Sequence, residues 1–198
     1  MYNLNVNQEC IYALEVNGHI VHYFVCTNDN LTDLAIGHLV AHGCLQKADI
    51  VNIAIDQEAM IIKVEAKTYA DAWNMHTEVK QIKQLPYQAA STLPALDRTA
   101  IKERMFAYHV KGQHTAMLIT PHACYLDKDV SRHCALDKVI AKADDYQDCT
   151  LVTSGRISIE MLLRARTLGI KNIATLKYPT DSALDIAMRL GINCIEIK

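Results

Sequence analysis

The sequence predicts an α/β protein in two parts, a smaller α+β domain over residues 1–94 and an α/β domain over residues 95–198. Strand-like and helix-like segments alternate after Gly112, and such alternation is typical of a mainly parallel sheet with right-handed crossovers. Near the start, Asn17-Gly18 separates two apolar runs, which favours an antiparallel hairpin. Residues 84–94 carry two of the four prolines and form the best linker candidate.

The predicted N-terminal domain begins with a hairpin and a helix. Residues 10–16 and 19–26 are expected to pair through a type I′ turn, because Asn and Gly tolerate the positive φ that this turn needs. A helix is expected to begin at residues 27–30 and to end at Gly43, with apolar residues at helical spacing between them. The elements predicted after it are a second hairpin over residues 50–55 and 59–64 and helices over residues 69–80 and 95–108.

In the predicted C-terminal domain, the helix over residues 95–108 is followed by a hairpin over residues 115–126, which would add an antiparallel strand to the sheet. Short apolar runs over residues 150–153, 170–176 and 192–197 are expected to be strands of one parallel sheet. Helices are expected before and between these strands, where apolar residues follow a helical period. Their apolar faces contain Ala135, Leu136, Val139 and Ile140; Met161, Leu162, Ala165 and Leu168; and Ala183, Ile186, Ala187 and Leu190.

The composition indicates an ordinary globular protein. The net charge is −2 and 51% of the residues are hydrophobic, so neither nucleic acid nor a membrane surface is expected as a partner. No apolar run has the length of a membrane span, and the first residues do not resemble a signal peptide. The seven cysteines are scattered and none is spaced C-x-x-C, which favours reduced thiols and a cytoplasmic location.

The segment of residues 128–138 is the first candidate site. It contains Arg132, His133 and Lys138 together with Asp129 and Asp137, at a predicted strand-to-helix junction. Such junctions hold ligands in open α/β sheets. The alternative is a charged loop followed by a solvated helical turn.

A second candidate follows the next predicted strand, at Ser154-Gly155-Arg156. A glycine lets the backbone approach a ligand, the following helix start attracts anions, and an arginine can bind a phosphate. The alternative is a turn glycine and an arginine that pairs with Glu160. Thr180 is most simply a helix cap.

Histidines offer weaker signals. His114 follows Gly112, where an unusual backbone angle is expected, and could act as a base or hydrogen-bond donor; the alternative is an ordinary, partly buried histidine. His38 and His42 share a helix face, but two ligands do not make a zinc site, so no metal is predicted. The chain has neither a G-x-S-x-G elbow nor the H-x-E and P-C-x-x-C pair of zinc deaminases.

Taken together, these motifs resemble the formate dehydrogenase accessory protein family (FdhD/NarQ). The family string D-V-G-R-H-N-A-x-D-K is similar to residues 129–138, and S-G-R-x-S-x-E-M matches residues 154–161 throughout. The shorter family strings G-G-x-H-x-A and P-T-x-x-A are similar to residues 112–116 and 179–183. The family's V-N-G string is similar to residues 16–18, and its first helix motif is similar to residues 27–43. The resemblance therefore covers nearly the whole chain.

The resemblance implies a cytidine-deaminase-like, three-layer α/β/α domain after the smaller α+β domain, and usually a homodimer. It implies a sulfurtransferase, or sulfur carrier, that takes sulfur from a cysteine desulfurase to the molybdenum cofactor for formate dehydrogenase. The cofactor's guanine dinucleotide (molybdopterin guanine dinucleotide), or a guanosine phosphate, would bind at the polar strand ends. The predicted cofactor-binding residues are Gly112, His114, Asp129, Arg132, His133, Asp137, Lys138, Ser154, Gly155, Arg156, Ser158 and Thr180.

The chain also departs from the family pattern. The family's carrier cysteines lie in a C-G-x-C-G loop, whereas residues 84–92 contain no cysteine, and the family's C-terminal tail motifs do not follow Lys198. A non-catalytic cofactor-binding homologue that has lost sulfur transfer is therefore the alternative function. If a thiol still carries sulfur, Cys134 is the candidate, because a helix start and His133 would lower its pKa. The alternative is a buried cysteine that packs the first helical turn.

Overall fold

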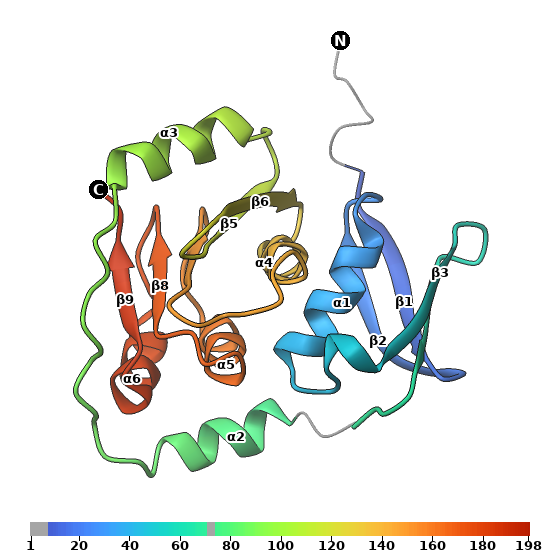
Figure 1. The fold of residues 1–198 in the computed structure, drawn as a ribbon, viewed down its shortest axis with the longest axis horizontal. Coiled ribbons are helices and arrows are strands. Elements are labelled where there is room, and N and C mark those ends of the chain that lie inside the picture. Colours follow the sequence, from blue (N-terminus) through green and yellow to red (C-terminus); the bar gives the residue numbers. More distant parts are fainter. Residues whose placement is uncertain (1–7, 71–73) are drawn as a thin grey trace.

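The computed structural model describes residues 8–70 and 74–198, and this part of the chain has a mixed α/β fold with two sheets (Figure 1). The first sheet has the strand order β2-β1-β4-β3 and the second has the order β6-β5-β7-β8-β9. Within these residues, no helix has both the length and the apolar character needed to cross a membrane.

The first sheet is formed by the two predicted hairpins. Asn17 (φ 50°) and Gly18 (φ 84°) make the turn of the first hairpin with positive φ, as expected for a type I′ turn. The two hairpins join because β1 pairs with β4 in parallel. The strands are β1 (Cys10–Val16), β2 (His19–Cys26), β3 (Ile50–Asp56) and β4 (Ile61–Ala66), and a 3₁₀ turn (Lys47–Asp49) precedes β3.

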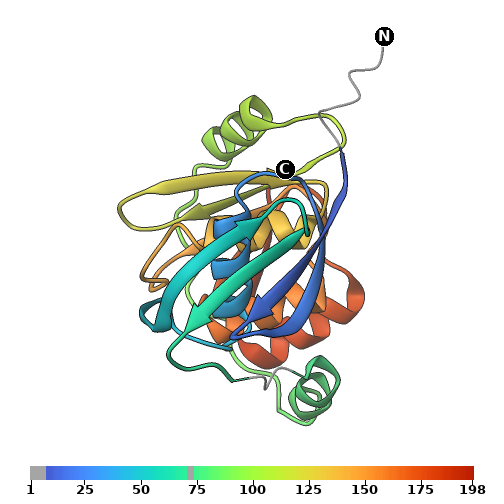
Figure 2. The ribbon, with the colours of Figure 1, turned by 90° about the vertical axis from the view of Figure 1, so that its right-hand side faces the viewer.

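Helix α1 (Leu31–Ala41) joins the two halves of the molecule. One side packs on the first sheet, where Leu34 and Leu39 are buried with Tyr12 and Ile62. The other side contacts α4 (Arg132–Ile140) so closely that a Cβ on Gly37 would lie 1.7 Å from the carbonyl oxygen of Asp137. Figure 2 shows the first sheet in front of α1, so this helix lies between that sheet and α4 (Figure 1). The glycine is therefore needed for the close approach.

The second sheet confirms the predicted topology. Strands β7, β8 and β9 are parallel, and β5 and β6 form the antiparallel hairpin that precedes them. Strand β6 continues to Asp129, beyond the predicted end at residue 126, so the first part of the polar segment is strand rather than loop. The strands are β5 (His114–Ile119), β6 (Cys124–Asp129), β7 (Thr150–Thr153), β8 (Asn172–Thr175) and β9 (Asn193–Glu196).

Helices cover both faces of the second sheet (Figure 1). Helix α3 (Arg98–Tyr108) places Ile101 and Met105 against Met117 and Val152 on one face. The other face is covered by α4, α5 (Ile159–Thr167) and α6 (Asp181–Leu190), which share a core with Leu118. The more specific likeness to cytidine deaminases stays a prediction.

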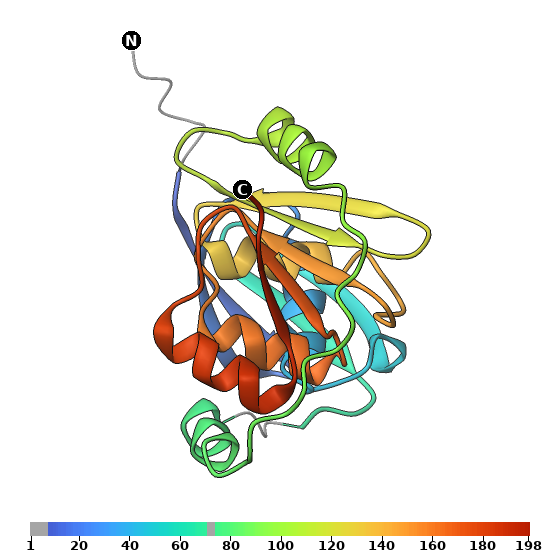
Figure 3. The same cartoon turned by 90° about the vertical axis from the view of Figure 1, so that its left-hand side faces the viewer.

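The connection between the halves differs from the expectation. The predicted helix over residues 69–80 is wrong at its start: α2 (Met75–Ile82) begins after Asn74, whose side chain accepts a hydrogen bond from Thr77 N (3.0 Å), and residues 71–73 lie outside the described part. Asparagine favours such a cap over the helix interior. Residues 83–97 then run without helix or strand along the edge of the second sheet (Figure 3). Ile82, at the end of α2, is buried in the core that the second sheet shares with α4, α5 and α6. The domain boundary at residue 94 stays a prediction.

Candidate functional site

The candidate site lies at one edge of the second sheet. Strands β6, β7 and β8 end at this edge, and α4, α5 and α6 begin there. His114 opens β5, which is antiparallel to its neighbours, so it pairs with Asp129 at the same edge. Thr175, at the end of β8, donates a hydrogen bond from its hydroxyl to the carbonyl oxygen of Gly155 (2.5 Å). The fold thus gathers the predicted site residues from four separate segments.

Gly155 forms the centre of this edge. A Cβ at this position would lie 3.3 Å from Arg132 Cδ, so a larger residue would displace that side chain slightly, and 3.5 Å from His114 Nδ1, which is an ordinary contact distance. Its N–H donates to Thr153 Oγ1 (3.1 Å), and Ser154 Oγ accepts from Thr115 N (2.9 Å). Burial lowers the pKa of His114, and the positive charge of Arg132 lowers it further. The histidine is therefore a neutral neighbour of the arginine.

Two arginines supply the positive charge of the edge. Arg156 is exposed, Arg132 is half-buried, and neither forms an ion pair with any residue in ranges 8–70 and 74–198. The alternative in which Arg156 pairs with Glu160 is wrong. Glu160 Oε2 instead lies 3.3 Å from His133 Nε2 and 3.9 Å from Arg164 Nη1. Both arginines are therefore available to an anion.

The three helix starts at this edge differ in their caps. Ser131 Oγ accepts from Cys134 N (3.4 Å) and Thr180 Oγ1 accepts from Ala183 N (3.2 Å), which confirms Thr180 as a cap. Ser158 does not cap α5; its hydroxyl lies 3.2 Å from His133 Nε2. The first turn of α5 therefore keeps backbone N–H groups without a side-chain cap, beside Arg132. Gly112 has φ +88°, the unusual angle that the sequence suggested.

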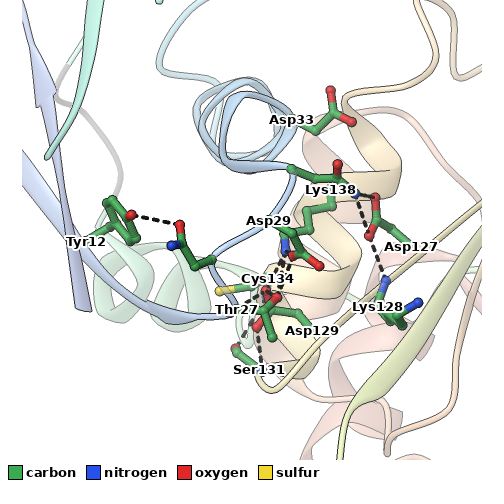
Figure 4. Close-up of polar contacts among 12 residues, drawn as sticks. Tyr12, Thr27, Asp29, Asp33, Asp127, Lys128, Asp129, Ser131, Cys134 and Lys138 are labelled. Atoms are coloured by element: carbon green, nitrogen blue, oxygen red, sulfur yellow. Dashed lines mark hydrogen bonds and ion pairs between the residues drawn. The ribbon is translucent and has the colours of Figure 1, made fainter. Parts of the chain in front are cut away.

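Two of the remaining charged residues of the 129–138 segment, Asp129 and Lys138, form a buried ion pair with each other (Figure 4). Lys138 is fully buried and its Nζ lies 2.8 Å from Asp129 Oδ2, which also accepts hydrogen bonds from Thr27 N (3.1 Å) and Oγ1 (2.9 Å). Asp29 forms a second ion pair with Lys138. Burial alone would lower the pKa of Lys138, but the two carboxylates outweigh it and raise the pKa. Asp129 and Lys138 thus connect α4 to residues 27–29, the segment that precedes α1.

Asp137 forms a second buried network. Its carboxylate lies 2.7 Å from Arg164 Nε and 3.3 Å from His38 Nδ1, and His38 Nε2 lies 3.3 Å from His42 Nδ1. Burial would raise the pKa of Asp137, but Arg164 and His38 outweigh it and hold the pKa well below its usual value. A nucleotide could contact Asp137 only if these partners moved. Its predicted role in ligand binding stays a prediction.

Cys134 is a buried side chain with 5% exposure, and its Sγ lies 3.6 Å from the carbonyl oxygen of Val25. Burial raises the pKa of the thiol, which is opposite to the lowering expected from a helix start and a neighbouring histidine. His133 does not help, because burial lowers its own pKa and leaves it neutral. The geometry favours the interpretation that Cys134 packs the first turn of α4.

Two adjoining cavities open at this edge. One has a volume of about 410 Å³ and lies between α2 and the starts of α4, α5 and α6, and the other, of about 340 Å³, lies beside β2. Met75, His133 and Glu160 line both. Sequence reasoning missed Met75 and Val79, because nothing local placed α2 over the site. It also missed His22, which no motif indicated. Glu160 was not predicted either, although its match to the family string S-G-R-x-S-x-E-M could have indicated that it belongs to the site.

Comparisons with known proteins agree on one family. The FdhD/NarQ family model matches residues 7–197. A sulfur carrier protein FdhD of Geobacillus kaustophilus is 30% identical over 92% of this chain and 80% of its own length, and one of Methanothermobacter thermautotrophicus is 26% identical over 92% and 81%. A crystal structure described as a formate dehydrogenase accessory protein, from Desulfotalea psychrophila, superposes with a TM-score of 0.76 at 22% identity, covering 96% of this chain and 83% of that one.

Proposed function

This chain belongs to the FdhD/NarQ family, and from that premise we propose that it is a formate dehydrogenase accessory protein that binds the molybdopterin guanine dinucleotide cofactor. The cofactor is cargo, which accepts sulfur before its insertion into the enzyme. A cysteine desulfurase and formate dehydrogenase, or another molybdoenzyme, are the proposed partners.

One observation carries the binding proposal: Arg132 and Arg156 have no ion pair within the described residues and flank Gly155 beside the uncapped start of α5. Two guanidinium groups and free backbone N–H groups are the donors that bind phosphate in other proteins. The residues present therefore fit the phosphate groups of a dinucleotide. Arg132 and Arg156 would bind these phosphates, and His114 would stay neutral beside them.

A second candidate function has its own support. Persulfide transfer needs a thiolate, but residues 84–92 contain no cysteine. Burial raises the pKa of four thiols, those of Cys26, Cys134, Cys149 and Cys194. These observations favour a homologue that binds the cofactor without transferring sulfur.

Calorimetry with GDP tests the binding proposal. The wild-type protein is expected to bind, and Arg156→Ala is expected to lower the affinity about tenfold, because a charge-assisted hydrogen bond is lost. Arg104→Ala, an exposed arginine on α3 at the opposite face of the sheet, is the matched control. No binding at millimolar GDP, or equal losses in the two variants, would contradict the proposal.

Persulfide mapping separates the two functions. The protein is incubated with a cysteine desulfurase and labelled cysteine, and modified thiols are located by mass spectrometry. A persulfide on Cys134 that disappears in Cys134→Ser, together with sulfuration of the cofactor, would support a sulfur carrier. If no cysteine is labelled while GDP still binds, the non-catalytic alternative holds.

The homodimer implied by the family resemblance is also a proposal. Ile11, Ile20, Tyr23 and Val25, on strands β1 and β2, are 48–63% exposed and form an apolar surface that a second copy could cover. Light scattering measures the mass in solution, and Tyr23→Asp should convert a dimer to a monomer.

A further inference from the structure

Two cysteines stand opposite each other at the end of the first sheet. Cys10, the first residue of β1, pairs in register with Cys26, the last residue of β2, in the antiparallel ladder of these strands. Residues directly opposite in such a ladder have side chains on the same face, with Cα atoms about 4.5–5.5 Å apart. A disulfide spans Cα separations of about 4.4–6.8 Å. The register therefore brings the two thiols within disulfide range.

This pairing of cysteines is specific to the first sheet. In the two sheets that residues 8–70 and 74–198 form, no other cysteine has a cysteine opposite it: Cys124 of β6 faces Ile119, and Cys194 of β9 faces Ile173. Cys10 and Cys26 both contact the apolar cluster between the first sheet and α1. Because they form the last pair of their ladder, the strand ends can adjust to the shorter Cβ separation of a disulfide.

The two thiols differ in their access to solvent. Cys26 is 0% exposed, whereas Cys10 is only partly buried, so a reagent in solution reaches Cys10 first. An accessible thiol beside a second thiol that can resolve it is the arrangement of redox-sensing cysteines.

The surroundings of Cys26 set the speed of the second step. Burial raises the pKa of its thiol to about 12; the negative charge of Asp129 adds to the rise, and Lys138 opposes it. The titratable groups that interact with it are Cys10, Tyr12, Asp29, Asp129 and Lys138. Only the thiolate is nucleophilic, so attack by Cys26 is slow near neutral pH and becomes faster as the pH rises.

We propose that Cys10 and Cys26 are a reversible redox pair, which a low-molecular-weight disulfide such as oxidised glutathione converts to a cross-strand disulfide. The thiolate of Cys10 attacks one sulfur of the oxidant, whose S–S bond breaks and releases one glutathione thiolate. The thiolate of Cys26 then attacks Sγ of Cys10, and the second glutathione leaves as the mixed disulfide breaks. The protein loses two protons and two electrons, and the oxidant is reduced to two thiols.

The disulfide would fasten the strand ends beside the contact between the two halves of the molecule. Thr27, which follows Cys26, donates hydrogen bonds from its N–H and its hydroxyl to Asp129 Oδ2. A bond between residues 10 and 26 also closes a loop and lowers the entropy of the unfolded chain. The oxidised protein should therefore unfold at a higher urea concentration than the reduced protein.

Thiol trapping and mass spectrometry test the pair. The protein is equilibrated with oxidised and reduced glutathione, free thiols are alkylated, and linked peptides are identified. The expected product is a Cys10–Cys26 link that forms faster at about pH 9 than at about pH 7 and disappears in excess reduced glutathione. Cys124→Ser is the matched control, because Cys124 is also a partly buried first residue of a strand but faces Ile119. It should keep the link and the shift in urea midpoint, and Cys10→Ser should lose both.

Cys10→Ser is the deciding variant, because its side chain is partly exposed and circular dichroism can verify that the variant is folded. A reaction that stops at a glutathione adduct of Cys10, a link between Cys26 and Cys134, or full alkylation of Cys10 and Cys26 under oxidising conditions would overturn the inference. A midpoint shift that persists in Cys10→Ser would overturn it too. None of these outcomes alters the prediction for GDP, because other residues line the cavity at the helix starts.

Discussion

The ten residues 129–138 supply both a buried network and part of the candidate site at the sheet edge. Asp129, Asp137 and Lys138 are 0–1% exposed and their charges are neutralised by protein partners. Arg132 and His133, from the same segment, line the cavity between the helix starts. The difference arises along the helix: the first turn of α4 lies at the sheet edge, whereas the next turn is covered by α1, where Gly37 contacts Asp137. Matching a family string therefore does not separate residues that hold the fold from residues that line a cavity.

The largest expected effect comes from the buried network. Lys138→Met removes the cation and leaves Asp129 buried without an ion pair, which should lower the free energy of unfolding by about 3–5 kcal/mol. Lys63→Met is the control, because Lys63 pairs only with the partly exposed Asp56 at 44% side-chain exposure among the described residues, and its loss should cost far less. Urea unfolding measures both. Equal losses would show that burial does not distinguish the two lysines.

The next effect tests the contact between α1 and α4. Alanine is the better helix former, yet Gly37→Ala should lower the free energy of unfolding by about 2–3 kcal/mol, because its Cβ would overlap the carbonyl of Asp137. Thr32→Ala, on the exposed side of α1, should change it by less than about 0.5 kcal/mol. A stabilised Gly37→Ala variant would contradict the close approach.

An effect of intermediate size is expected from pH. His42 is 8% exposed, and burial lowers its pKa to about 3, with His38 and Arg164 adding to the shift. Below pH 6.5 the unfolded chain takes up a proton that the folded chain does not bind, so acidification destabilises the protein. Urea unfolding should give about 2 kcal/mol less stability at pH 4.5 than at pH 7 from this group.

Two variants assign that pH dependence. His42→Gln, which cannot titrate, should reduce the difference between pH 7 and pH 4.5, whereas His122→Gln, at an exposed turn, should leave it unchanged. An unchanged difference in His42→Gln would show that another group is responsible.

The smallest effect on stability is expected at the exposed edge. Arg132→Gln should change the free energy of unfolding by less than about 0.5 kcal/mol, because Arg132 has no ion pair within residues 8–70 and 74–198. The same variant should lower the affinity for GDP about tenfold, measured by calorimetry. A large loss of stability would show that Arg132 stabilises the fold as the buried charged residues do.

The local structure and the family could be predicted from the sequence alone. Asn17-Gly18 identified the first hairpin, Gly43 the end of α1, and the alternation after Gly112 the parallel strands, because turn chemistry and hydrophobic period act over a few residues. It also predicted that these polar segments lie at one edge of the sheet, since strand ends followed by helix starts meet on one side of a parallel sheet. The start of α2 was not predictable from the same signals, because one asparagine cap shortened a longer helical pattern.

The sequence does not show which polar side chains pair with other residues of the folded chain. Asp129 meets Thr27, and Arg164 meets Asp137, across separations of 102 and 27 residues, so no local pattern shows that these charges are paired. Long-range contacts also bury Cys134 and raise its pKa, and the fold places His22 of the first sheet and Glu160 of α5 in the lining of one cavity. The burial and pairing of a side chain depend on neighbours from distant segments, and these neighbours come together only in the folded chain.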